Sequence, residues 1–183
     1  MITILQHIFS PRLNILLSIV LFLAALPVLP QTQEGNPSDK LFLKALFTRD
    51  WLIAANYLID TSAFDHSNPD EKEEYYLKAA VLFALGQDSL NAVKSYEHWV
   101  ESHSKPDDET TGLSNPDALL YKAAIEQYND NTLAVIDQLH RSSDNRKMTT
   151  TWDSVMMADS YGLLAKSYKR LQDYEEADQY FML

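Results

Sequence analysis

The sequence contains no cysteine and only 4 glycines in its 183 residues. Without cysteine there can be no disulfide, thiolate metal ligand, cysteine nucleophile or lipid-modified cysteine. So little glycine is atypical of an all-β protein, in which turns recur every ~8–12 residues. It also predicts few turns that need a positive φ angle. The composition therefore favours an all-α chain.

Basic residues are scarce relative to acidic ones. The chain has 15 Lys and Arg against 26 Asp and Glu, and its net charge is −11. An acidic surface repels phosphate backbones, and no stripe of basic residues offsets it. The sequence therefore predicts no nucleic-acid partner.

Features of catalytic or metal-binding sites are also missing. The sequence has neither a glycine-rich phosphate loop nor a Gly-x-Ser-x-Gly nucleophile turn. The nearest set of metal-ligand types is Glu97, His98, Glu101 and His103, but its spacing is not that of a His-Glu-x-x-His site. These residues are expected at a solvated helix end. We expect no catalytic, cofactor-binding or metal-binding residue and no enzymatic activity, and a helical enzyme domain is the least favoured alternative.

The first thirty residues contain a long apolar run, expected to form a helix. It extends from Leu13 to Leu29, follows Arg12 and precedes a polar linker over residues 31–38. At ~1.5 Å per residue such a helix spans ~25 Å, just short of a hydrocarbon core. Residues 1–30 are predicted to be a signal peptide or a retained membrane anchor, and both remain open because Pro30 obstructs the obvious cleavage site. In either case we expect an exported protein, periplasmic or attached to the cell envelope. It would touch the membrane only through residues 13–29 if they are not removed.

The remaining chain, residues 39–183, shows apolar residues at helical spacing. In residues 73–85, for example, Tyr76, Ala80 and Phe83 share one face, and Pro106 follows the next helix as a stop signal. The pattern predicts about four antiparallel helix pairs, with residues 152–159 beginning the seventh helix early. The expected pairs are 39–48 with 50–61, 73–85 with 90–102, 117–128 with 132–141, and 160–171 with 174–181.

Alanines recur at matching places in these pairs. Ala80 and Ala92 are twelve residues apart, and so are Ala165 and Ala177. Antiparallel helices approach closely only where their side chains are small, so these alanines are expected at the helix crossings. One pair cannot bury its apolar face alone, which predicts that the pairs stack.

The final pair resembles a tetratricopeptide repeat. The aromatic and small residues that carry the resemblance are Tyr161, Leu164, Ala165, Tyr168, Tyr174, Ala177 and Phe181. The resemblance is weaker in the pair from Tyr76 to Trp99 and holds only in outline for the other two. It implies a right-handed α-solenoid that holds a peptide or a protein in a concave groove, and it brings no catalytic residue.

The last repeat is incomplete relative to that pattern, because the sequence stops at Leu183. A solenoid end without a polar cap exposes apolar surface. Two explanations are open: a homodimer through the uncapped C-terminal helix, or a fragment of a longer protein. The expected function is a scaffold or adaptor for a protein or peptide partner outside the cytoplasm. The alternative is the N-terminal sensor region of a longer envelope signalling receptor.

Most tyrosines follow the repeat face and are expected in the core. Four fall off that face and are the candidate residues of a partner-binding groove, where aromatic side chains often anchor ligands. They are Tyr57, Tyr75, Tyr121 and Tyr180.

Overall fold

The computed structural model describes residues 37–64, 69–103 and 114–183. This part of the chain is all-α: it contains eight helices and no strand, which confirms the expected fold class. None of its helices is both long and apolar enough to cross a membrane. The apolar run at 13–29 and most of the expected linker at 31–38 lie outside the described residues.

The helices agree with those expected from the sequence, apart from a few residues at their ends. The helix that contains residues 160–170 begins as early as Thr151, which confirms the expected early start. In chain order the helices are α2 (Pro37–Thr48), α3 (Trp51–Phe64), α4 (Pro69–Leu85), α5 (Ser89–His103), α7 (Pro116–Glu126), α8 (Thr132–Asn145), α9 (Thr151–Arg170) and α10 (Tyr174–Phe181).

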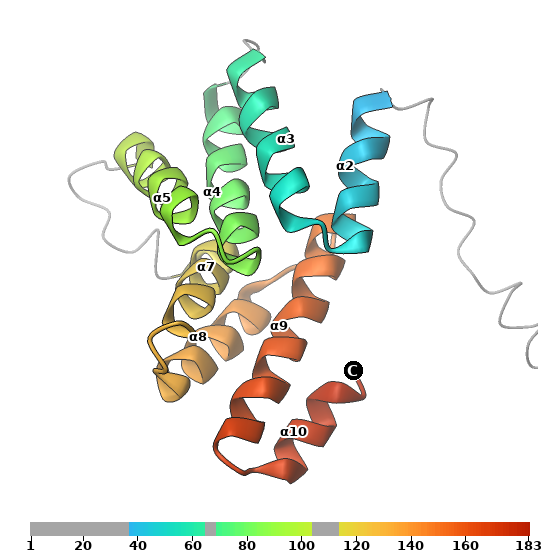
Figure 1. The fold of residues 1–183 in the computed structure, drawn as a ribbon, viewed down its shortest axis with the longest axis vertical. Coiled ribbons are helices and arrows are strands. Elements are labelled where there is room, and N and C mark those ends of the chain that lie inside the picture. The colour runs from blue at the N-terminus through green and yellow to red at the C-terminus, as the bar shows by residue number, and fades with distance from the viewer. Residues whose placement is uncertain (1–36, 65–68, 104–113) are drawn as a thin grey trace, which may run out of the picture. The chain divides into compact units, whose positions relative to one another are not determined.

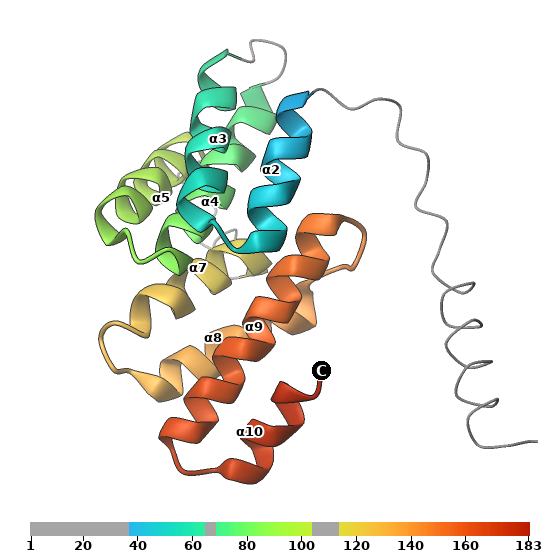
Figure 2. The ribbon, with the colours of Figure 1, turned by 45° about the vertical axis from the view of Figure 1, so that its right-hand side comes forward.

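The helices pack mainly against their neighbours in the chain. Within residues 39–183, which form one compact unit, α4 contacts α5, α7 contacts α8, and α9 contacts α10. Between pairs, α3 contacts α4 and α8 contacts α9, so the second helix of one pair packs against the first helix of the next. Helix α4 also contacts α7. Figures 1 and 2 show this succession along the unit.

The four turns that join the helices of a pair share one geometry. In the second turn the amide of Asp88 donates to the carbonyl of Phe83 at 2.9 Å, five residues earlier. The same bond joins Asp50 to Ala45, Asn131 to Glu126, and Asp173 to Tyr168. Each turn contains one residue with positive φ, as a helix end in the left-handed conformation requires. These residues are Arg49 (58°), Gln87 (66°), Asp130 (56°) and Gln172 (62°).

The expectation of few positive-φ turns is therefore wrong. Scarce glycine suggested it, but none of these four turns places glycine at the left-handed position. Asp tolerates that conformation because its short polar side chain can bond locally. At Arg49 and Gln87 the hydrogen bonds of the helix end hold the backbone in place.

Alanine and leucine fill the core. The expected crossing residues Ala80, Ala92, Ala165 and Ala177 are all buried, which confirms their predicted place. The largest side chains that are almost fully enclosed come from five helices and include Leu46, Leu82, Leu119, Leu120, Leu139, Met156 and Leu164.

One ion pair links the beginning of the unit to α9. The Nε of Arg49, in the turn after α2, donates to Oδ1 of Asp159 at 3.1 Å. Burial raises the pKa of Asp159, and the Arg49 guanidinium offsets part of that rise. The turn between α2 and α3 is therefore held against a helix 110 positions further along the chain.

Candidate functional site

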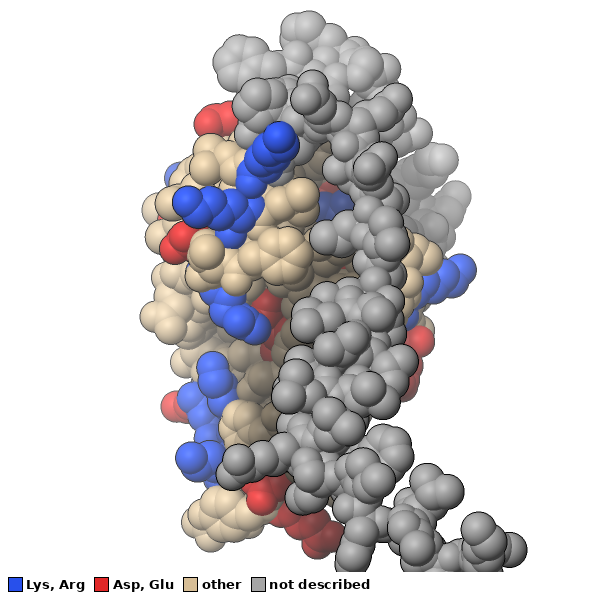
Figure 3. Space-filling model, turned by 90° about the vertical axis from the view of Figure 1, so that its right-hand side faces the viewer, with Lys and Arg blue, Asp and Glu red and all other residues tan. Residues whose placement is uncertain are grey.

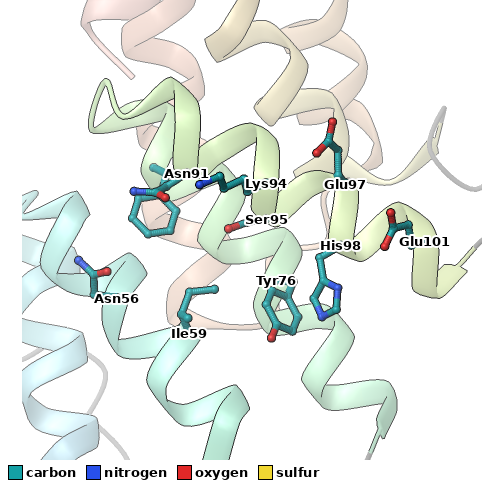
Figure 4. Close-up of a pocket in the computed structure, with 10 residues that line it drawn as sticks. Asn56, Ile59, Tyr76, Asn91, Lys94, Ser95, Glu97, His98 and Glu101 are labelled. Atoms are coloured by element: carbon teal, nitrogen blue, oxygen red, sulfur yellow. The ribbon is translucent and has the colours of Figure 1, made fainter.

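A hollow lies between α3 and α5, with α4 beneath it (Figure 4). We call it the α3–α5 groove, and its volume is about 540 Å³. Its lining is polar along the walls and partly apolar on the floor. The lining residues are Asn56 and Ile59 from α3, Tyr76 and Phe83 from α4, and Asn91, Lys94, Ser95, Glu97, His98 and Glu101 from α5.

The start of α5 fixes the α5 wall of the groove. Asp88 precedes the helix, and its carboxylate accepts from the backbone amide of Asn91 at 3.2 Å and from the side-chain amide at 2.7 Å. Asp88 therefore caps the start of the helix. Because residues three and four apart share a helix face, Asn91, Lys94, Ser95 and His98 follow one another along the groove. The cap and the helical spacing therefore fix the positions of the residues on the α5 wall.

His98 of α5 lies against Tyr76 of α4 in the groove. Its ring meets that of Tyr76 edge to face, with the ring centroids 4.0 Å apart and the planes at 85°. Glu97 points away from this ring pair, as Figure 4 shows. Among the described residues no three His, Cys, Asp or Glu side chains are placed to hold a metal ion. The groove therefore offers amide, ammonium, imidazole and carboxylate groups around an aromatic floor, a set suited to binding a polar chain.

The candidate tyrosines Tyr57 and Tyr121 each stack on an aromatic ring from another helix of the unit. Tyr57 stacks on Phe42 of α2 with the centroids 5.4 Å apart. Tyr121 stacks on Tyr96 at 4.2 Å and is only 6% exposed. Burial, with Tyr96 and Glu97 nearby, raises the pKa of Tyr121 to about 12. Tyr121 therefore presents little surface to a partner.

The other two candidates also have separate surroundings. Tyr75 on α4 is half-buried and packs against the main core cluster. Tyr180 on α10 is half-buried as well, and it stacks on Tyr168 with the centroids 5.7 Å apart and the planes 2° apart. None of the four tyrosines lines the α3–α5 groove, and their role in partner binding stays a prediction.

Sequence reasoning did not find the groove residues. Asn56, Asn91 and Lys94 belong to no motif and lie outside the apolar stripes that revealed the helices. They come together because α3 and α5 flank α4, which is a property of tertiary packing. The sequence predicted that His98 lies at a solvated helix end, not that it lines a groove.

A buried polar cluster also went unpredicted. Arg146, just after α8, donates from Nη2 to Oδ1 of Asp117 at 2.7 Å, and its side chain is 1% exposed. The indole Nε1 of Trp152 donates to Oδ2 of the same carboxylate at 3.0 Å. Asp117, in the first turn of α7, thus joins the end of α8 to the start of α9. This position between three helix ends indicates a structural role.

No model of a known family matches the chain, and neither does any curated protein or solved structure.

Proposed function

We propose that this protein is a non-catalytic binding module that holds a segment of a protein or peptide partner in the α3–α5 groove. The observation that carries the proposal is the groove itself. It is a hollow of about 540 Å³ with side-chain amides on both walls, from Asn56 and Asn91. Each amide nitrogen already donates one hydrogen bond within the protein, from Asn56 to the carbonyl of Leu52 and from Asn91 to Asp88. An amide has a second N–H and a carbonyl oxygen, and these match the donors and acceptors of a peptide backbone.

The repeated construction of the unit supports a tetratricopeptide-like solenoid as the frame of this module. Four turns of the same type occur at the same place in successive helix pairs. The contacts of α3 with α4 and of α8 with α9 repeat one mode of stacking. Stacked pairs suit binding because they expose long surfaces on a frame held by local contacts. We propose that the four pairs form a right-handed solenoid of this kind.

We also propose that the module works outside the cytoplasm. The support for this is the apolar run from Leu13 to Leu29 with Arg12 before it, the pattern of an export signal or an N-terminal anchor. The total absence of cysteine means that an oxidising compartment would find no thiol to modify.

A photo-reactive amino acid placed in the groove tests the binding role. The full-length protein would carry it at Asn56 on the α3 wall or at Lys94 on the α5 wall, in cells that make the protein. The control position is Leu133 on α8, which is 70% exposed and does not line the groove. We expect both groove positions to cross-link one and the same partner, identified by mass spectrometry, and the control not to. Equal cross-linking from all three positions, or none from the groove, would contradict the proposal.

A further inference from the structure

Two helices at different places in the unit each have an exposed face that combines apolar residues with charged ones. On each face the charges have a single sign, and the two faces differ in that sign. The first is on α2 and consists of Lys40, Leu43, Lys44 and Phe47, which we call the α2 stripe. These residues are exposed, Phe47 to 65%. Their spacing of three and four places them along one side of the helix. The two ionisable residues of this stripe, Lys40 and Lys44, are both basic.

The second face is on α10 and consists of Tyr174, Glu175, Asp178 and Phe181, which we call the α10 stripe. These residues also lie side by side on the helix and are exposed, Phe181 to 58%. Ala177, three residues after Tyr174 and four before Phe181, is buried, so the stripe borders the side of α10 that contacts α9. The charged members of this stripe are both acidic. The α10 stripe therefore has the opposite charge to the α2 stripe, and each stripe contains two large apolar or aromatic side chains.

Figure 3 looks onto the side of the unit that carries α2 and α10. Figure 1 places α2 toward the upper end of this side and α10 toward its lower end, and both basic and acidic side chains occur along the length of the face in Figure 3. The two stripes thus lie at different ends of the unit. A contact that joins them directly would bring together two copies of the chain.

We propose that the occupant of the α10 stripe is the α2 stripe of a second copy of this chain. Such a contact would place Phe181 and Tyr174 against Phe47 and Leu43, with lysines opposite carboxylates. The unit uses this kind of packing at two of its three junctions between pairs, where α3 meets α4 and α8 meets α9, while α4 and α7 make the junction between the second and third pairs. At the first two, the second helix of one pair contacts the first helix of the next. Helix α10 is the second helix of its pair and α2 is the first helix of its own.

Charge selects this arrangement over a symmetric dimer. An α10-to-α10 contact would bring Glu175 and Asp178 of both copies together, and an α2-to-α2 contact would bring Lys40 and Lys44 together. Like charges facing each other across an interface oppose binding. The contact of α2 with α10 is heterologous, so each copy keeps one unused stripe and further copies can add to the chain. This association does not involve the α3–α5 groove and does not rest on the proposed function.

Disulfide cross-linking between two tagged variants tests the contact, because the natural chain has no cysteine to interfere. Full-length Phe47→Cys with one affinity tag and full-length Phe181→Cys with another would be purified in detergent, mixed and oxidised. We expect a cross-linked dimer that carries both tags, and at least tenfold less dimer from either variant alone. A mixture of Phe47→Cys with Leu133→Cys is the control for random collision and should give no cross-link above background.

Charge reversal provides the second arm. Adding Lys40→Glu and Lys44→Glu to the Phe47→Cys partner should lower the mixed dimer at least tenfold. Adding Glu175→Lys and Asp178→Lys to the Phe181→Cys partner should then restore it, which a misfolded variant could not do. A dimer from Phe181→Cys alone that equals the mixed dimer would overturn the proposal in favour of a symmetric contact. No mixed dimer above the Leu133→Cys control would also overturn it.

Discussion

Replacing Arg146 by methionine tests whether the buried cluster holds three helix ends together. The substitution keeps much of the side-chain volume but removes the guanidinium that lies 2.7 Å from Asp117 and 3.5 Å from Asp153. The Asp117 carboxylate would then stay buried with only the indole of Trp152 as its side-chain donor. Breaking a buried ion pair by removing one partner typically costs ~3–5 kcal/mol. We expect Arg146→Met to lower the free energy of unfolding by that amount.

A double substitution separates the pair from the packing around it. In Asp117→Asn with Arg146→Met, the charge of Asp117 is removed as well, and the asparagine carbonyl can still accept from Trp152. Asp153 loses the guanidinium but keeps its hydrogen bonds from Thr149 and Thr150. In the natural protein the Nε and Nη1 atoms of Arg146 are buried without a hydrogen-bond partner among the described residues. The ion pair is therefore incompletely satisfied. Replacing both partners of such a pair is often close to neutral, so the double variant should be at least ~2 kcal/mol more stable than Arg146→Met.

Urea unfolding followed by circular dichroism measures both effects on the purified protein. The free energy of unfolding must fall with urea concentration at the same slope in each variant as in the natural protein. A shift in the unfolding midpoint then reports a change in stability. A loss below ~1 kcal/mol for Arg146→Met would refute the reasoning, because that is the range of exposed ion pairs. The reasoning would also be refuted if the double variant lost as much free energy of unfolding as Asp117→Asn and Arg146→Met lose together.

Three further predictions concern local features. Gly162 lies inside α9, and a Cβ there would meet no atom within 4 Å, so Gly162→Ala should raise the free energy of unfolding by ~1 kcal/mol in urea; a loss would contradict this. Tyr128 donates its hydroxyl to the carbonyl of Ala84, so Tyr128→Phe should cost ~1 kcal/mol, and an unchanged urea midpoint would refute the importance of that bond. Burial of Asp153 opposes its ionisation, but hydrogen bonds from Thr150 and Thr149 outweigh burial and lower its pKa below 3.8. The carboxylate therefore contributes stability above that pH and loses it as the pH falls through the lowered pKa. Asp153→Asn should flatten the drop in urea midpoint between pH 5 and pH 3, and an equally steep drop in both proteins would contradict this.

The sequence predicted the helices well because their signals are local. The spacing of Ala80, Ala92, Ala165 and Ala177 depends only on the period of the helix, and all four are buried as expected. Helix ends were predicted to within a few residues, since the signals that end a helix act within about one turn. The positive-φ turns were missed because residues such as Arg49 and Gln87 give no sign of that conformation in the sequence.

The site could not be predicted in the same way, because it depends on which helices meet. Tyr121 lies off the repeat face of its own helix, but Tyr96 from α5 covers it. Arg146 belongs to a polar stretch that reads as a break between helices, and its partner Asp117 is 29 positions away. Neither contact follows from the spacing of residues within one helix. The groove residues Asn56 and Lys94 were missed for the same reason.

The proposed binding role requires that a partner occupies the α3–α5 groove. The most direct measurement compares, by quantitative mass spectrometry, the protein recovered with the tagged full-length natural chain and with Asn56→Trp combined with Lys94→Glu. The first change fills the groove from one wall and the second reverses a charge on the other. The matched control is Leu133→Trp with Lys147→Glu, two exposed positions that do not line the groove. We predict that the groove variant loses its partner at least tenfold while the control keeps it and both melt like the natural protein; equal recovery with the two variants would contradict the account.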